Sequence, residues 1–501
     1  MNRRNLLRAG VGLAGAAVLG TGLYELLKPG SQTGQLLGSE APIPPAFQVP
    51  LPIPAVLTPS RTDGTTDYYE ITQGISTLSV LPGLKTPAWT YNGTFPGPTI
   101  VSRSGRKTVV KHTNQLPEAS VVHLHGGHTP ADSDGYPIDL VMPVSGHDMA
   151  SMSGMNTMQR DVSQGSREYA YPFDQPAATL WYHDHRMGAT APNVWKGLAG
   201  FHLVRDDESD ALPLPRGDRD IPLMLADRSF AADGSFLYKA LMPGVLGDVQ
   251  LVNGAPWPVL AVDPARYRLR LLNAANARRY RLELDPQPPG GDAFVQIAAD
   301  GGLLARPVGH DAVQLAPGER FEVVVDFAKY KPGTRVRLVN TFASGRMREV
   351  MRFDVTGSDR GDDSSVPATL AEIPVLDPAK AVATRTFRFH QTPGGTWTVN
   401  DLEYKPGRAL ATPKLGSIEV WRFVTDYHHP IHLHLNHFQV LSRNLFEPGA
   451  YDAGWKDTID LRPAEGAEIV TRFTDYAGAF LLHCHNLEHE DMAMMADFQT
   501  S

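Results

Sequence analysis

Apolar and polar residues alternate along three separate stretches of the chain. The stretches are KTVVKHTN (107–114), YRLRLLN (267–273) and IEVWRFV (418–424). Strict alternation places side chains in turn on the two faces of an extended backbone, so each stretch predicts a half-buried β-strand. We therefore expect a protein that is built mainly from strands.

Each predicted strand follows a similar phrase, in which an asparagine precedes Gly or Asp. The asparagines are Asn92, Asn253 and Asn400, so the repeat is about one domain long. Each copy also closes alike, with the segments GLAGFHLVRD (197–206), EVMRFDV (349–355) and MAMMADFQ (492–499). This repetition predicts three tandem Greek-key β-sandwich domains, because a solenoid would repeat over a much shorter length.

Two segments rich in turn-forming residues, 206–218 and 356–372, lie between the copies. The expected organisation follows from them. It consists of an export signal and leader at 1–40, a first domain at 41–205, a second domain at 206–355, a linker at 356–380 and a third domain at 381–501.

The first residues have the pattern of a targeting segment. Arg3, Arg4 and Arg8 precede the apolar stretch 11–27, which is a positive region before a short hydrophobic one. The adjacent arginines indicate the twin-arginine export route, and thus a periplasmic or extracellular protein. A general secretory signal or an uncleaved N-terminal membrane anchor is the alternative.

The amino-acid composition says less about the function of the protein than the sequence pattern does. The 501 residues include 46 Gly and 41 Pro, which suits strands and turns, and the net charge of -8 offers no basic surface for nucleic acid. A single cysteine, Cys484, excludes an internal disulfide. It must be an apolar core residue, a nucleophile or a metal ligand.

Ten of the eighteen histidines fall in four clusters, two near each end of the chain. Residues i and i+2 of a strand share one face, so every H-x-H aims two imidazoles in the same direction. The members of these pairs are His123, His125, His183, His185, His432, His434, His483 and His485. Eight neutral imidazoles suit copper, zinc or iron, and three copper ions would use all eight.

The middle copy differs from the outer two at this point. Where they read VVHLHGG (121–127) and HPIHLH (429–434), it reads NARRYRLEL (276–284) and has no histidine. We expect the outer domains to bind the metal and the middle domain to serve as a spacer.

Cys484 lies between His483 and His485, so strand geometry points its sulfur away from both rings. It must then serve a second metal. Two His, one Cys and a distant Met form the blue-copper set, which transfers electrons, and His429, Cys484, His489 and Met494 provide it here. Zinc has no redox use for such a thiolate link.

These motifs resemble the three-domain multicopper oxidases, and the branch of bacterial spore-coat laccases and bilirubin oxidase in particular. The resemblance covers nearly all of the chain after its leader and implies cupredoxin domains with four coppers. It implies type 2 copper at His123 and His432, and type 1 copper at His429, Cys484, His489 and Met494. It implies a type 3 pair at His125, His183, His185, His434, His483 and His485.

The same resemblance implies that type 1 copper oxidises a donor one electron at a time while the three-copper cluster reduces O2 to water. Asp134 and Glu490 occupy the positions of the family's proton-relay acids, and carboxylates can carry protons to a buried site. The alternatives are that Asp134 forms a turn and that Glu490 orients His489.

The expected donors are phenols and aromatic amines, and the protein is expected to be a monomer. The alternative is a cuprous or other metal-ion oxidase in copper tolerance. Met149, Met152, Met155 and Met158 are spaced three residues apart beside His147, and thioethers favour Cu(I). A flexible loop or one apolar helical face is the preferred interpretation of that spacing.

Overall fold

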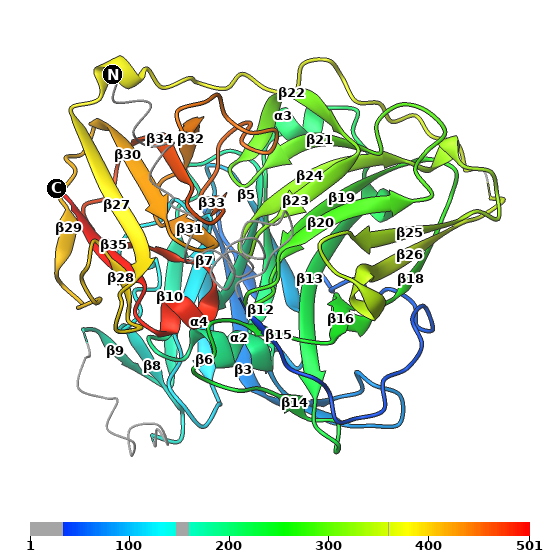
Figure 1. Ribbon diagram of the computed structural model, residues 1–501, viewed down its shortest axis with the longest axis horizontal. Coiled ribbons are helices and arrows are strands. Elements are labelled where there is room, and N and C mark those ends of the chain that lie inside the picture. The colour runs from blue at the N-terminus through cyan, green and yellow to red at the C-terminus, as the bar shows by residue number, and fades with distance from the viewer. Residues whose placement is uncertain (1–33, 147–159, 359) are drawn as a thin grey trace, which may run out of the picture.

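The computed structural model describes residues 34–146, 160–358 and 360–501 (Figure 1). The predicted export signal therefore lies almost wholly outside the described residues, and so do His147 and the four spaced methionines. Within the described residues, no helix has both the length and the apolar character needed to span a membrane.

Six large sheets form three face-to-face pairs, as the three alternating stretches predict. In the first pair, one sheet has the order β10 (Ser166–Tyr171), β6 (Lys107–Asn114), β3 (Thr66–Leu78), β2 (Arg61–Thr62), with β4 (Thr86–Tyr91) also paired to β3. The other has the order β5 (Gly97–Arg103), β12 (Ala199–Arg205), β11 (Ala178–Asp184), β7 (Val122–His125).

The middle pair holds the largest sheet. Its order is β17 (Ala255–Pro256), β16 (Val249–Val252), β13 (Asp220–Phe230), β19 (Arg266–Asn273), β24 (Arg320–Asp326), β21 (Phe294–Ala299), β22 (Gly302–His310), with β14 (Phe236–Leu237) on β13. The facing sheet has the order β18 (Val259–Val262), β26 (Glu349–Val355), β25 (Arg335–Asn340), β20 (Tyr280–Asp285), β23 (Ala312–Leu315).

The third pair repeats the plan. One sheet has the order β28 (Trp397–Val399), β27 (Ala383–Gln391), β30 (Ile418–Thr425), β34 (Gly466–Arg472), β32 (Phe438–Arg443). The other has the order β29 (Ala409–Ala411), β36 (Met495–Thr500), β35 (Gly478–Cys484), β31 (His429–Leu433), β33 (Thr458–Leu461). In Figure 1 the middle pair is green and the third runs from yellow to red.

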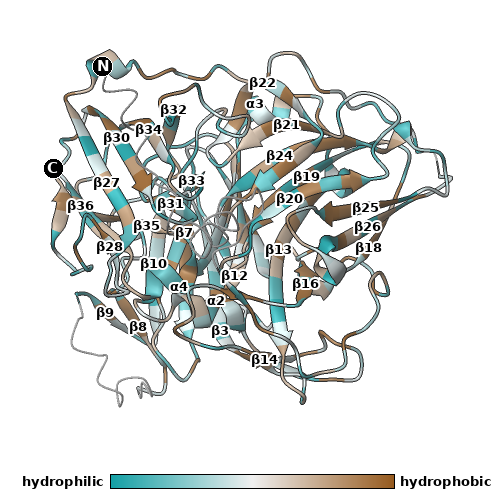
Figure 2. Ribbon diagram, viewed as in Figure 1, coloured by the Kyte–Doolittle hydropathy of each residue, from teal (hydrophilic) through white to brown (hydrophobic). Residues whose placement is uncertain are grey.

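The repeated sequence features have the same structural role in each copy. The alternating stretches become β6, β19 and β30, and each pairs in parallel with an earlier strand. The closing segments become β12, β26 and β36, which also pair in parallel. Alternating hydropathy is visible along β27 and β30 in Figure 2. The prediction of an all-β protein with three sandwiches is confirmed.

The three asparagines explain why the phrase recurs. Asn92, Asn253 and Asn400 all have positive φ, a conformation that Asn tolerates better than most residues. Each side-chain oxygen accepts a hydrogen bond from a backbone N–H of the preceding part of the same sandwich, at 2.7, 2.8 and 2.7 Å. In the first copy the asparagine thus fixes the turn before β5, and in the second it fixes the turn before β18. In the third copy it fixes the equivalent turn, which follows β28.

Short elements join the sandwiches. They are β1 (Gln35–Leu36), β8 (Leu140–Met142), β9 (Val162–Gln164), β15 (Val245–Leu246), α2 (Thr190–Lys196), α3 (Asp207–Ala211), α4 (Leu487–Asp491) and the 3-10 turns Gly217–Arg219, Phe327–Lys329, Gly345–Arg348 and Pro378–Lys380. β1 pairs with β15, and Leu51 N–H donates to the Val259 carbonyl. The chain therefore crosses the middle sandwich before it enters the first. Helices α2 and α4 contact one another (Figure 1).

Candidate metal centres

Eight imidazoles meet where the first and third sandwiches face each other, and we call this group the histidine cluster. Its members are His123, His125, His183, His185, His432, His434, His483 and His485. β7 runs antiparallel to β11, which sets His123 opposite His183. β31 runs antiparallel to β35, which sets His432 opposite His483. Strand pairing within each sandwich thus gathers four rings, and the interface brings the two sets of four together.

Ring nitrogens in the histidine cluster approach closely. The Nε2 atoms of His434 and His483 are 3.1 Å apart, and those of His123 and His432 are 3.3 Å apart. Nitrogens of His125, His183 and His485 lie within 4.8 Å of one another, and so do those of His185, His434 and His483. Such spacing allows three rings to share one ion.

The remaining hydrogen bonds orient these rings. Nδ1 of His123 lies 2.5 Å from the Asp134 carbonyl, and Nδ1 of His432 lies 3.0 Å from the Asp457 carbonyl. A carbonyl only accepts, so each Nδ1 carries the proton and each Nε2 keeps a lone pair that faces the cluster.

Burial keeps His183 and His185 neutral. It lowers the pKa of His183 to about 3 and that of His185 to about 4, so neither is protonated at neutral pH. Nε2 of His183 and both ring nitrogens of His485 are buried without a hydrogen-bond partner among the described residues. Buried polar atoms without a partner are costly, and an ion that accepts their lone pairs removes that cost. The donor set fits copper.

Cys484 forms the second centre, which we call the cysteine centre, together with His429 and His489. Its Sγ lies 3.3 Å from Nδ1 of His429 and 3.5 Å from Nδ1 of His489. Nε2 of His429 faces the Asp426 carboxylate at 2.9 Å, and Nε2 of His489 faces the Pro243 carbonyl at 3.0 Å. These acceptors take the Nε2 protons and leave both Nδ1 lone pairs directed at the sulfur.

Two-fold alternation along β35 separates the two centres. Phe480, Leu482 and Cys484 pack in the core of the third sandwich, whereas His483 turns to the histidine cluster. Met494 belongs to that core too, and its carbonyl accepts a hydrogen bond from Cys484 N–H at 3.0 Å. Burial raises the pKa of the Cys484 thiol, so a thiolate there requires a cation beside it. Trp397 stacks on His489 with a centroid distance of 3.8 Å.

Two buried carboxylates predicted from the sequence reach the histidine cluster. Glu490 lies 3.2 Å from Nδ1 of His483 and 3.7 Å from Nε2 of His185. Burial acts to raise the pKa of Glu490, but these two histidines outweigh it and the pKa falls. Asp134 Oδ2 lies 2.8 Å from Nδ1 of His434, and burial raises the pKa of Asp134.

A third carboxylate, Asp457, is missing from the sequence prediction. Its Oδ1 lies 3.1 Å from Nε2 of His125 and 2.7 Å from Nη1 of Arg320, and Arg320 is wholly buried in the middle sandwich. Neither residue belongs to a histidine motif. Only the long-range contact between the middle and third sandwiches reveals them.

The middle sandwich is therefore more than the expected spacer. Gly318 has φ +88°, and a Cβ there would lie 3.0 Å from ring atoms of both His125 and His485. Its backbone thus closes one side of the histidine cluster. Pro243 holds His489 of the cysteine centre, as described above. The middle sandwich shapes both centres without contributing a histidine to either.

Helix α4 joins the three sandwiches at these centres. Glu488 accepts hydrogen bonds from Asn276 Nδ2 at 2.7 Å and Val245 N–H at 3.1 Å in the middle sandwich. Asp491 accepts the N–H groups of Thr190 and Ala191 in the first turn of α2, each at 2.9 Å. His489 and Glu490, which lie between these two anchors, are thereby fixed toward the two centres.

Comparison with known proteins agrees with this geometry. The multicopper oxidase family models match residues 74–209 and 373–501. A laccase of Bacillus stratosphericus is 37% identical over 89% of this chain and 97% of the relative. The bilirubin oxidase of Albifimbria verrucaria is 35% identical over 94% and 84%. The crystal structure of a laccase from Pediococcus acidilactici superposes with a TM-score of 0.82 at 32% identity, covering 93% of this chain and 96% of that one.

Proposed function

This chain belongs to the multicopper oxidases, and we propose that it is a laccase-like member that oxidises phenols and aromatic amines. As a multicopper oxidase it is a copper-dependent oxidoreductase with cupredoxin-like domains, four copper ions and O2 as the acceptor. The single observation that supports the donor class most is the similarity to laccases over about nine tenths of the chain.

Copper supplies the one-electron redox chemistry that imidazole and thiol groups lack. We propose that His429, Cys484, His489 and Met494 hold the type 1 ion and that His123 and His432 hold the type 2 ion. We propose two sets of three for the type 3 pair, His125 with His183 and His485, and His185 with His434 and His483. The close approach of ring nitrogens within each set of three supports this division.

The last residues of β35 and His485, which follows it, connect the two centres. His483, Cys484 and His485 are consecutive, so only a few covalent bonds separate the sulfur from two rings of the histidine cluster. Asp426 and Pro243 keep the rings beside the sulfur in one tautomer. A site held in this way needs little rearrangement when its charge changes.

Glu490 and Asp134 are the proposed proton carriers. Glu490 is placed to pass a proton at its carboxylate beside Nδ1 of His483, and Asp134 at Oδ2 beside Nδ1 of His434. Both side chains are almost wholly buried, so solvent cannot supply protons to those atoms directly. Reduction of O2 to water consumes protons, and fixed carboxylates are suitable relays.

Oxygen uptake with a panel of donors tests the donor class. Copper-loaded protein should consume O2 with phenols and aromatic amines faster than with Cu(I). Rapid uptake with Cu(I) and none with the organic donors would instead favour the metal-ion oxidase. The four spaced methionines can be replaced by leucine in the same assay, and the proposal requires organic-donor turnover to survive.

We further propose export by the twin-arginine route to the periplasm or outside the cell. Adjacent Arg3 and Arg4 before an apolar stretch support it. Replacing both arginines by lysine should keep the protein in the cytoplasm, as cell fractionation would show. Unchanged export of that variant would favour the general secretory route.

A further inference from the structure

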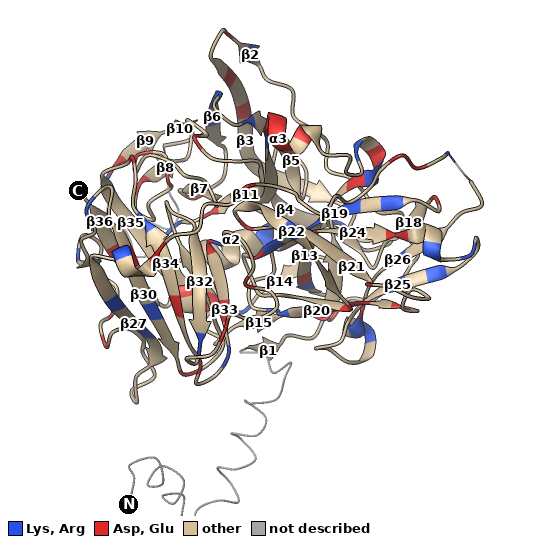
Figure 3. Ribbon diagram, turned by 90° about the horizontal axis from the view of Figure 1, so that it is seen from above, with Lys and Arg blue, Asp and Glu red and all other residues tan. Residues whose placement is uncertain are grey.

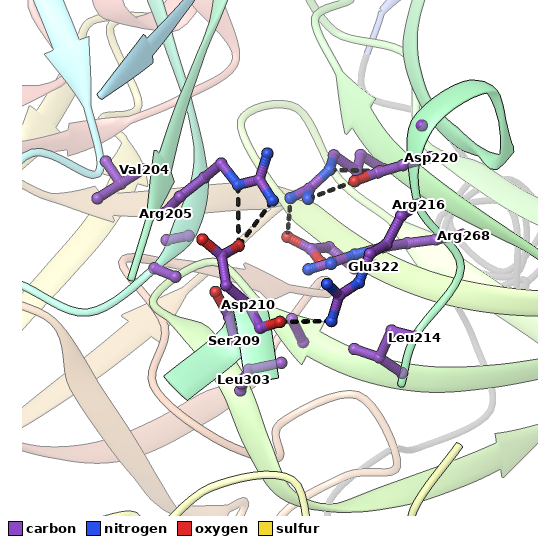
Figure 4. Close-up of a pocket in the computed structure, with 15 residues that line it drawn as sticks. Val204, Arg205, Ser209, Asp210, Leu214, Arg216, Asp220, Arg268, Leu303 and Glu322 are labelled. Atoms are coloured by element: carbon purple, nitrogen blue, oxygen red, sulfur yellow. Dashed lines mark hydrogen bonds and ion pairs between the residues drawn. The ribbon is translucent and has the colours of Figure 1, made fainter. Parts of the chain in front are cut away.

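Four arginines surround a pocket between the first and middle sandwiches, and we call it the arginine pocket. Its charged lining consists of Arg205, Asp210, Arg216, Asp220, Arg268, Arg270 and Glu322. Figure 4 shows Arg205, Arg216 and Arg268 around it, which come from β12, the segment after α3 and β19. Figure 3 shows the contrast between basic β19 and acidic α3. None of these residues belongs to either metal centre.

The carboxylates of the arginine pocket are already satisfied. Both oxygens of Asp220 accept from Arg270, at 2.7 and 2.8 Å. Glu322 accepts from Arg268 and Arg270, each at 2.7 Å, and from the Thr179 hydroxyl. The carboxylate of Asp210 accepts from Arg205 and, at its other oxygen, from Arg103 outside the lining. Four guanidinium groups against three carboxylates leave this lining with one excess positive charge.

Some guanidinium nitrogens of these arginines donate no hydrogen bond to the protein and can therefore donate to a ligand. Arg205 uses Nε and Nη2, Arg268 uses Nε and Nη2, and Arg216 uses Nη2 alone. Within the described residues, Nη1 of each has no protein acceptor. Arg268 is only 8% exposed, so its free N–H groups can reach little besides the pocket.

We propose that the arginine pocket binds a tetrahedral oxyanion such as inorganic phosphate or sulfate. Guanidinium forks match the spacing of oxyanion oxygens, and the excess positive charge favours an anion over water. Arg205 comes from the first sandwich, Arg216 from the connecting segment and Arg268 from the middle sandwich. A bound oxyanion would therefore link these parts and stabilise their packing in the native state.

Thermal unfolding of the copper-loaded full chain tests this site. Phosphate and sulfate are added separately at constant ionic strength, with chloride as the balancing salt, and calorimetric titration measures phosphate affinity directly. We expect a saturable rise of the unfolding midpoint with either oxyanion, because a ligand of the native state stabilises it by mass action. Chloride alone should give no comparable saturation.

Arg216→Gln is the first test variant because Arg216 is exposed and its loss should not prevent folding. Phosphate affinity should fall about ten-fold, as for the loss of a charge-assisted hydrogen bond. Arg306→Gln is the matched control, since Arg306 is exposed on β22, outside the arginine pocket, and changes the net charge equally. Oxidase activity without phosphate should be unchanged in both variants.

Arg205→Gln provides an independent second variant from the first sandwich, with the same expected loss of affinity. The proposal is overturned if phosphate gives no saturable effect on the parent protein. It is equally overturned if Arg216→Gln and Arg205→Gln both bind phosphate as the parent does, because binding would then occur elsewhere.

Discussion

The outer sandwiches and the middle one use the same strand position for different purposes. β7, β20 and β31 each lie beside the corresponding strand of their own sheet, β11, β25 and β35. β7 and β31 present imidazoles there, whereas β20 is preceded by Arg278 and Arg279. Arg278 bonds Asp227 within the middle sandwich at 2.7 Å, and Arg279 bonds Asp460 of the third at 3.0 Å.

The difference shows that the position of a strand determines which neighbours a side chain can contact. The chemical type of the side chain then determines whether it can bind a metal or form an ion pair. A neutral imidazole offers a lone pair to an ion, but a guanidinium stays charged and only donates. At the same position the outer sandwiches therefore gather ligands, and the middle sandwich forms ion pairs that connect it to its neighbour. Four predictions test this contrast, and the largest effect comes first.

Cys484→Ser should abolish both the blue colour and turnover of the copper-loaded protein. Serine removes the soft thiolate on which the proposed type 1 site depends, while the similar size preserves the core of the third sandwich. Visible absorption and oxygen uptake measure the two losses, and circular dichroism checks the fold. A coloured, active variant would refute the role given to Cys484.

Glu490→Gln should slow O2 reduction at least roughly ten-fold and leave the colour unchanged, because an amide cannot relay a proton. The matched control is Glu488→Gln, which changes the same helix and the same burial but faces the middle sandwich. The control should lose about 1 to 2 kcal/mol of stability and keep its rate. Equal rates in both variants would remove Glu490 from the proton path.

Arg279→Met should destabilise the protein by about 2 to 3 kcal/mol, because Asp460 keeps its charge at a largely buried interface and loses its partner. Urea unfolding followed by fluorescence measures the change. Arg281→Met is the control from β20, since Arg281 is more exposed and pairs with Glu283 of its own strand. A loss no larger than in the control would mean that the middle sandwich does not depend on this pair.

His112→Phe should flatten the decline of stability in acid. Burial lowers the pKa of His112 to about 3 in the first sandwich, below the ordinary 6.5. The unfolded chain therefore binds the extra proton first, and stability present above pH 6.5 is lost as the pH falls toward 3. Unfolding of copper-free protein across this window measures the slope.

Local patterns in the sequence predicted the repeated architecture and the histidine pairs. Alternation, H-x-H spacing and the positive-φ asparagines all act over a few residues, so one sequence suffices to find them. Gly318, Arg320 and Asp457 could not be found in this way. Each contributes through a contact between sandwiches, and nothing in its neighbouring sequence marks the partner.

No local sequence pattern predicted how the segment before the first sandwich pairs with the rest of the chain. Leu51 bonds the middle sandwich at Val259, about two hundred residues later, although the segment belongs by sequence order with the first domain. Such a pairing depends on how complete sandwiches pack. The contacts of Glu488 and Asp491 also depend on how sandwiches pack, because their partners lie on the middle and first sandwiches.

The histidine cluster joins segments that lie far apart in the chain. His123 and His432 are 309 positions apart, and His185 and His483 are 298 apart. Bringing such distant segments together has an entropic cost, and the packing of the intervening middle sandwich helps to offset it. An ion held by rings of both outer sandwiches would therefore oppose the separation of these two parts of the chain.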